Sequence, residues 1–294
     1  MPPGRRCNWA FVQNHFLFSQ KLPTHGVESC VWWAHNPTGK ALVFVHGFAG
    51  QALSTWAGFP SRLCDDPKCA GWDLYFFGYD GRHTEAASSA AKLEGLLDAM
   101  AKSPADVFKA STAWQRSARV HPATYERVVL VAHSLGAIVA RRAMLGGYTR
   151  RPQTPWATKV ELFLYAPAHL GARVALLVRE IMGPLAERFV AIAQAFKKYL
   201  VLRDVDAALG AKGSLGRFQS MLDETSKEVV NPPRANLGAI GLVWKENDMI
   251  VTNDRLPPDP SIEPDHVLSD CTHSTVCKPT ESFPQPFKLL IAKL

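Results

Sequence analysis

One stretch decides the fold, and it reads Val128-Val129-Leu130-Val131-Ala132-His133-Ser134-Leu135-Gly136-Ala137. A continuous apolar run, typical of a strand buried on both faces, leads into Ser134, and a helix is predicted over residues 135–145, ended by Gly146-Gly147. A serine between a buried strand and a helix has the geometry of a nucleophile elbow, which lifts the hydroxyl above the sheet. Gly136 and Ala132 supply the small side chains that this turn needs, because the two backbones nearly touch there. The alternative interpretation is a serine that only caps the helix.

Working outward, further apolar runs predict four more buried strands, at residues 41–45, 73–77, 160–165 and 239–244. Helices are expected between and after them, at residues 84–100, 106–117 and 287–294. At the start of the chain, residues 7–16 and 27–35 are expected to form two antiparallel strands joined by a turn. Strands that alternate with helices predict an α/β fold, with a mostly parallel central sheet and helices on both faces.

Length and composition fit one domain over residues 1–294, since 47% of the 294 residues are hydrophobic and 20% are charged. This composition excludes disordered and collagen-like chains. The net charge of +7 comes from scattered basic residues. It is compatible with peripheral contact to anionic lipid headgroups, whereas no helix-turn-helix or zinc-finger pattern supports nucleic-acid binding. The sequence does not predict an oligomeric state.

The location predicted for the protein is cytoplasmic. Near the first residue no secretory signal with a long apolar core is recognisable, and no uncharged apolar run reaches the ~20 residues of a membrane span. Six cysteines show no CxxC pair. Cys64 with Cys69, or Cys271 with Cys277, could pair or bind a metal, but reduced structural thiols are the preferred interpretation.

One long interval interrupts the alternation, between the strands predicted at 160–165 and 239–244. Within it a helical stripe of apolar residues is split by Gly183-Pro184 into two helices. We predict a helical cap insertion at about residues 171–232. Two interpretations stay open: helices packed on the core, or a cap whose apolar underside faces a substrate.

A second loop follows a buried strand and reads His46-Gly47-Phe48-Ala49-Gly50. Ligands of open α/β sheets bind at the carboxyl edge of the strands, where this loop and Ser134 both lie. We predict an oxyanion hole made by the backbone N–H groups of Phe48 and Leu135, with Ala49 as the alternative to Phe48. His46 is expected to brace the loop rather than act as a base.

A serine nucleophile needs a base, and the base needs an orienting carboxylate, in the chain order serine, acid, histidine. Asp248 sits in the turn after the strand at 239–244 and is the preferred acid, with Glu246 and Asp254 as alternatives. His273 lies in a polar loop before the last predicted helix and is the preferred base, and His266 is the alternative.

Taken together, these segments resemble the α/β-hydrolase superfamily. Within it they are similar to lipase-like serine esterases related to the GPI-inositol deacylase group. The shared motifs are HGFAG with Thr55-Trp56, Phe77-Gly78-Tyr79-Asp80, AHSLG, Ala166-Pro167-Ala168-His169-Leu170-Gly171, ENDMIV at 246–251 and HSTVCKP at 273–279. Departures from the family pattern are Ala132 and Ala137 at the outer glycines of the elbow, and Ala168 between Pro167 and His169. The resemblance implies that Ser134, Asp248 and His273 are nucleophile, orienting acid and general base.

The function expected from these observations is that of a serine hydrolase. It would cleave carboxylic esters through an acyl-enzyme, with acyl-chain or lipid-like substrates and with no cofactor or metal. One alternative is a non-catalytic signalling or binding protein with the same fold. Another is an amidase, thioesterase or acyltransferase that uses the same triad. Gly213-Ser214-Leu215-Gly216 imitates part of an elbow but follows no predicted strand, so Ser214 is expected to be a cap residue.

Overall fold

The computed structural model describes residues 11–12, 14–21, 28–104, 107, 124–150, 152–169, 172–173, 176–177, 180, 237–252, 259–261 and 263–294. Its centre is a nine-stranded sheet with the order β1-β2-β3-β5-β4-β6-β7-β8-β9. The strands are β1 (Phe11–Val12), β2 (His15–Lys21), β3 (Glu28–Ala34), β4 (Lys40–Val45), β5 (Trp72–Phe77), β6 (Arg127–His133), β7 (Val160–Tyr165), β8 (Ala239–Lys245) and β9 (Val267–Leu268). From β5 to β9 all neighbours run parallel, while β1, β2 and β3 form an antiparallel edge.

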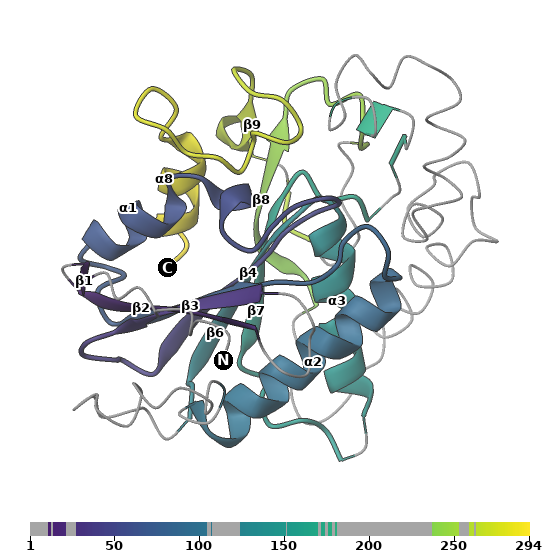
Figure 1. Ribbon diagram of the computed structural model, residues 1–294. Coiled ribbons are helices and arrows are strands. Elements are labelled where there is room, and N and C mark those ends of the chain that lie inside the picture. Colours follow the sequence, from purple (N-terminus) through teal and green to yellow (C-terminus); the bar gives the residue numbers. More distant parts are fainter. Residues whose placement is uncertain are drawn as a thin grey trace, which may run out of the picture.

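Helices cover the sheet on both sides (Figure 1). On one face lie α2 (Ala86–Lys102) and α3 (Leu135–Thr149), which pack against each other. On the other face lie α1 (Phe59–Asp65) and α8 (Gln285–Ile291), joined by the rings of Phe59 and Phe287 at 6.0 Å. The predicted α/β-hydrolase architecture, a mostly parallel sheet between two helical layers, is confirmed for this part of the chain.

The central strands are apolar over most of their length because both of their faces are covered. Every residue of β5 is buried, and so are all residues of β4 after Lys40 and of β6 after Arg127. Aromatic rings fill the space between the sheet and α1: Phe44 stacks on Phe76 at 4.8 Å and meets Trp56 edge-on at 5.0 Å. A rigid sheet of this kind holds the loops at its carboxyl edge in fixed positions.

The predicted end of the helix after Ser134 was wrong. Instead of stopping at Gly146-Gly147, α3 continues to Thr149. Both glycines serve close packing rather than termination: a β-carbon on Gly146 would overlap the carboxylate of Glu94, and one on Gly147 would overlap the ring of Trp156. A glycine pair inside a helix therefore marks a close approach here.

Other boundaries also differ from the prediction, and the helix expected at 84–100 lies two residues later at both ends, at Ala86–Lys102. The strand that pairs with β3 is β2 at His15–Lys21, not residues 7–16, because the chain folds back between β1 and β2, with Val12 opposite His15. In this turn the Asn14 carbonyl accepts the His35 N–H and its side-chain amide donates to the Cys64 carbonyl. The last helix begins at Gln285 and ends at Ile291, two residues early at its start and three at its end.

Some predictions fall outside the described residues. These are the turn at 23–26, the helix at 106–117 and nearly all of the insertion at 171–232. Of the insertion, the structure describes Ala172, Arg173, Leu176, Leu177 and Glu180. Ala172 forms an isolated bridge with Val251, and the Arg173 N–H donates to the Ile250 carbonyl at 2.7 Å, so the start of the insertion is tied to the loop after β8.

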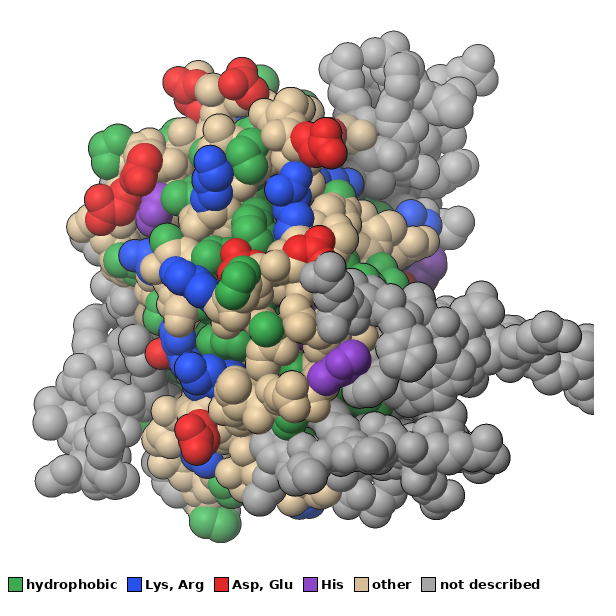
Figure 2. Space-filling model, turned by 90° about the vertical axis from the view of Figure 1, so that its left-hand side faces the viewer, with side chains coloured by type: hydrophobic (Ala, Val, Ile, Leu, Met, Phe, Trp, Pro, Cys, Tyr) green, Lys and Arg blue, Asp and Glu red, His purple; other side chains and the backbone are tan. Residues whose placement is uncertain are grey.

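The described surface is mixed in charge (Figure 2), and the described thiols form no disulfide. Figure 2 shows basic side chains spread among acidic and apolar ones on the face that it displays. Cys64, Cys69 and Cys277 are buried and form no disulfide, and burial raises the pKa of each of these thiols to about 12. None of the helices that the structure describes has the length and apolar character needed to cross a bilayer.

Candidate active site

Ser134 lies in a sharp turn between β6 and α3, with a φ of 53° and a ψ of −120°. Residues with a β-carbon rarely adopt a positive φ, and such strained positions concentrate at functional sites. The turn is fixed from two sides, because the Ser134 N–H donates to the Tyr165 carbonyl at 3.0 Å and the Ser134 carbonyl accepts the Ala168 N–H at 3.2 Å. This backbone holds the Ser134 side chain at the carboxyl edge of the sheet.

Small residues make the turn sterically feasible. A β-carbon on Gly136 would overlap the carbonyl oxygens of Val45 and His46, so only glycine lets α3 start this close to β4. Gly47 faces the serine in the same way, since a β-carbon there would stand 3.0 Å from that of Ser134. Ala132 is fully buried. The predicted requirement for small neighbours around Ser134 is met, with the strictest one at Gly136.

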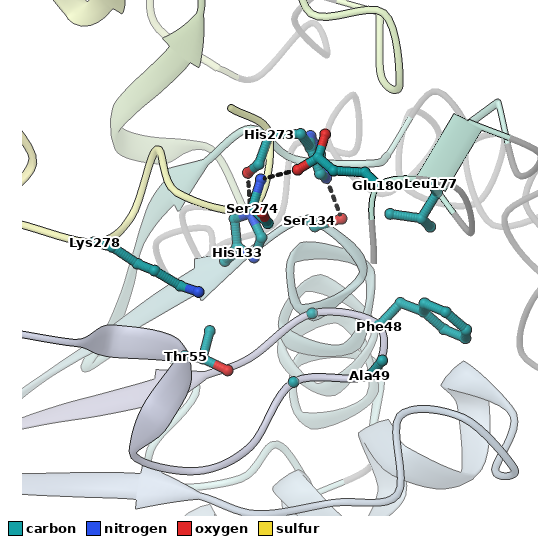
Figure 3. A pocket seen from close by; sticks show the side chains of 12 residues that line it. Phe48, Ala49, Thr55, His133, Ser134, Leu177, Glu180, His273, Ser274 and Lys278 are labelled. Atoms are coloured by element: carbon teal, nitrogen blue, oxygen red, sulfur yellow. Dashed lines mark hydrogen bonds between the residues drawn. The ribbon is translucent and has the colours of Figure 1, made fainter. Parts of the chain in front are cut away.

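A chain of hydrogen bonds joins the three side chains that the sequence singled out, and Figure 3 shows the part of it between Ser134 and His273. The Ser134 Oγ and the His273 Nε2 are 2.9 Å apart, and the His273 Nδ1 lies 2.8 Å from Asp248 Oδ2. The side chains of His273 and Asp248 are 2% and 1% exposed. If Nδ1 carries the imidazole proton and donates it to the carboxylate, Nε2 is left as an acceptor for the serine hydroxyl.

Asp248 is held ionised by its partners. Burial alone raises the pKa of its carboxyl, but the hydrogen bond and charge of His273 and the N–H groups of Ile250 and Val251 outweigh burial and lower it below the ordinary value. The two N–H groups donate to Oδ1 at 2.8 and 3.3 Å, which leaves Oδ2 for His273. The carboxylate is therefore oriented toward the imidazole before any substrate binds.

The alternative base, His266, is not the histidine bonded to Ser134, and the described alternative acid, Glu246, is not the carboxylate bonded to His273. His266 lies in η6 (Pro264–His266), and it is His273 that the structure brings to Ser134. Glu246 is exposed in the turn after β8, where its N–H donates to the Leu268 carbonyl. Asp254 lies outside the described residues. The geometry thus brings Ser134, His273 and Asp248 together, and their roles as nucleophile, base and acid stay a prediction.

His46 braces the loop after β4, as expected. Its Nδ1 donates to the Gly47 carbonyl at 2.9 Å, and its ring stacks on Tyr79 at 4.2 Å. The Tyr79 hydroxyl donates in turn to the His46 carbonyl at 2.5 Å. Burial lowers the pKa of His46 to about 4, so the ring is neutral at physiological pH. The loop that carries Phe48 and Ala49 is thereby attached to the segment after β5.

His133 has a role that sequence reasoning missed. Its Nε2 donates to the backbone carbonyl of His273 at 2.8 Å, which fixes the loop that carries His273 against the end of β6. Burial and the neighbouring charges of His273 and Lys278 lower the pKa of His133 to about 3. The only signal in the sequence was its place directly before Ser134, and the prediction gave this residue no function.

A cavity of about 250 Å³ opens beside Ser134. Its described lining comes from the loop after β4, the end of β6, the start of the insertion and the His273 loop, and includes Phe48, Ala49, Thr55, Leu177, Glu180 and Lys278. Leu135, the first residue of α3, follows the serine, and first-turn N–H groups of a helix have no acceptor within the helix. Phe48 and Ala49 line the cavity and Leu135 directly follows Ser134, and the oxyanion hole assigned to their backbone N–H groups remains a prediction.

Two parts of this arrangement had no signal in the local sequence. Glu180 Oε1 accepts the Ser274 N–H at 2.8 Å, so the described part of the insertion holds the His273 loop. The buried ion pair of Arg141 with Asp259 joins α3 to the segment before β9, and Asp259 also accepts the Ala239 N–H at 3.0 Å. Among the described residues, no group of three His, Cys, Asp or Glu side chains could hold a metal ion.

Sequence and structure comparisons relate the chain to known proteins. Residues 42–283 match the Alpha/beta hydrolase family. No curated protein sequence is significantly similar to the chain. Among solved structures, the mature form of the Bacillus licheniformis lipase BlEst2 is similar with a TM-score of 0.50 and 18% identity, covering 93% of this chain and 97% of the lipase. The propeptide form of the same lipase gives the same TM-score and identity, covering 94% of this chain and 53% of that one.

At this identity the likeness to the lipase shows a common fold and nothing finer. The family match is broader evidence, because it runs from β4 through the turn at Ser134 to the loop beyond His273. The chain belongs to the Alpha/beta hydrolase family.

Proposed function

We propose that this protein is a serine hydrolase that cleaves carboxylic esters through an acyl-enzyme. The observation that carries the proposal is the hydrogen-bonded chain Ser134–His273–Asp248 at the edge of the cavity. Ser134 Oγ attacks the ester carbonyl while His273 Nε2 takes its proton, and Asp248 stabilises the imidazolium. The backbone N–H groups of Phe48 and Leu135 stabilise the oxyanion.

The second half of the reaction uses the same groups in reverse. The imidazolium gives its proton to the departing alcohol, which leaves the acyl group on Ser134. Water then gives a proton to His273 and attacks the acyl carbonyl, and His273 returns this proton to Ser134 Oγ as the acid leaves. Each step is a proton transfer or a carbonyl addition within reach of the three side chains, so the proposal needs no cofactor or metal.

Acyl-chain or lipid-like substrates are the substrate class we propose. Phe48 and Leu177 give the cavity apolar lining, and both are nearly buried, at 7% and 3% exposure. The same proposal includes further hypotheses. We propose a helical cap at 171–232 that contacts the substrate, and peripheral contact with lipid headgroups. We also propose a cytoplasmic location and a relation to the GPI-inositol deacylase group. An amidase, thioesterase or acyltransferase would use the same acyl-enzyme, with a different leaving group or acceptor.

A panel of p-nitrophenyl esters of increasing chain length, with and without phospholipid vesicles, tests this function. We expect hydrolysis with a preference for longer chains, and a fall in kcat of about 10⁴-fold or more in Ser134→Ala. Ser61→Ala removes an exposed hydroxyl on α1 and is the matched control. Equal rates for all chain lengths would contradict the acyl-chain preference, and a fully active Ser134→Ala would contradict the mechanism.

A further inference from the structure

The cavity beside Ser134 has two chemically different sides. In Figure 3, Phe48 and Leu177 lie to one side of Ser134, and Lys278 and Thr55 lie to the other. The first side therefore carries the apolar side chains, with the Glu180 carboxylate beside Leu177, and the other presents an ammonium and a hydroxyl. A substrate whose carbonyl rests at Ser134 would extend toward both.

Lys278 brings a positive charge to this cavity and forms no ion pair with a described carboxylate. Its side chain is half-buried, and it makes no ion pair or hydrogen bond with the described residues. The acidic side chain of the lining, Glu180, is engaged through Oε1 with the Ser274 N–H. A partly buried ammonium is more stable with an anion beside it than without one, because burial removes part of its hydration.

Thr55 adds a hydrogen-bond donor on the same side. Its Oγ1 accepts the Gln51 N–H at 2.9 Å, which fixes the oxygen, and the hydroxyl proton has no acceptor among the described residues. Thr55 is only 8% exposed and lines the cavity. A fixed hydroxyl and an ammonium are together a donor set for carboxylate or phosphate oxygens.

We propose that the cavity selects esters whose alcohol part carries an anionic substituent, a carboxylate or a phosphate. Lys278 Nζ and Thr55 Oγ1 bind this substituent, while the acyl chain lies against Phe48 and Leu177. The inference rests on the proposed ester hydrolysis and names its substrate class. Lys278 and Thr55 are specificity-determining residues in this account, since neither takes part in the transfer of the acyl group.

Matched pairs of butyrate esters test the subsite. The carboxylate pair compares the butyrate ester of 4-hydroxybenzoate, which is anionic, with the butyrate ester of methyl 4-hydroxybenzoate, which is neutral. A 4-phosphophenyl butyrate supplies the phosphate arm. The readout is the ratio of kcat/KM for the anionic ester to that for the neutral one, which cancels intrinsic reactivity when variants are compared. We expect this ratio to fall about tenfold in Lys278→Met and further in Lys278→Glu, since a hydrogen bond to a charged group is lost.

Controls separate charge from structure. Lys278→Arg keeps the cation and should keep the ratio, and Lys102→Met removes an equal charge from the exposed end of α2 and should also keep it. In the wild type, added salt should lower the ratio, because ions screen the attraction. The salt dependence is measured on the wild type, so it tests the subsite even if Lys278→Met does not fold.

Two results would overturn the inference, in different ways. If the neutral ester is hydrolysed and the ratio is the same in wild type and Lys278→Met, or does not respond to salt, the anionic subsite is wrong while the ester hydrolase stands. If the folded wild type hydrolyses none of these esters and Ser134 resists acylating probes, the proposed hydrolysis is wrong and the subsite is wrong with it.

Discussion

Asp248 is the residue whose assignment depends most on structure, since three acidic residues follow β8 within a short stretch. Two N–H groups hold its Oδ1, and His273 Nδ1 lies against its Oδ2, so the carboxylate is aimed at the imidazole. Glu246 points to a different environment, exposed at the turn. In the proposed mechanism, Asp248 sets which nitrogen of His273 carries the proton.

Asp248→Asn should therefore lower kcat by about 10³- to 10⁴-fold, because an amide at Oδ2 favours the wrong imidazole tautomer. The fall should appear in kcat more than in KM, measured on a p-nitrophenyl ester. Glu246→Gln is the control and should stay near the wild type. The acid assignment would be wrong if Asp254→Asn were the damaging change and Asp248→Asn were mild.

At the scale of elements, α3 connects the site to the rest of the fold. It begins at the strained turn of Ser134 and continues through Gly146-Gly147 because α2 and the Trp156 loop approach it closely there. The Trp156 ring is pinned, since it is 3% exposed and its Nε1 donates to Asp98 Oδ1 at 2.7 Å. Glu94, which faces Gly146, ends in a flexible carboxylate paired with Arg150.

The two glycines should respond differently to alanine. Gly147→Ala should destabilise the protein by ~1–3 kcal/mol, because the new methyl overlaps a fixed ring. Gly146→Ala should change stability by less than about 1 kcal/mol, since the Glu94 carboxylate can move aside and alanine favours a helix. Urea unfolding of both variants measures this. Equal effects of the two substitutions would refute the packing explanation.

The bounds of the central strands could be predicted from the sequence, whereas the end of α3 and a buried ion pair could not. Apolar runs predicted β4 to β8 to within a residue or so, because strands buried on both faces are apolar at nearly every position. The end of α3 was missed because the signal for a helix stop and the signal for close packing are the same residue, glycine. The ion pair of Arg141 with Asp259 was missed because nothing local relates residues so distant in the chain.

The sequence identified the three side chains that meet at the candidate site, but not the contacts that hold them there. Ser134 and Asp248 each follow a predicted strand, and His273 was chosen for its polar loop before the last helix and for the family resemblance. His133, Glu180 and Lys278 act on the site only through tertiary contacts or placement at the cavity. No periodicity or motif in the sequence marks such contacts.

At the scale of the whole molecule, buried histidines couple stability to pH. Burial lowers the pKa of His46 to about 4 and that of His133 to about 3, from 6.5. The unfolded chain therefore binds more protons than the folded one below pH 6.5, so stability is lost as pH falls from 6.5 toward those values. Asp248 has a lowered carboxyl pKa, so its contribution is lost only at more acidic pH.

We expect the free energy of unfolding to fall as pH is lowered from about 6.5 to 4.5, by up to ~1.4 kcal/mol per pH unit for each buried histidine. His46→Asn keeps a donor near Nδ1 but cannot titrate, and should flatten this slope. Leu63→Ala, in the core at α1, destabilises without removing a titrating group and should keep it. A His46→Asn slope equal to that of the wild type would contradict the account.

The central claim is that Ser134 is a nucleophile activated by His273. Its most direct test is reaction with a fluorophosphonate probe, followed by intact mass and peptide mapping. We predict one adduct, on Ser134, in the wild type and in Ser214→Ala, the serine of the imitation elbow, and none in Ser134→Ala or His273→Ala. A folded wild type that gains no adduct, or an adduct that persists in Ser134→Ala, would contradict the claim.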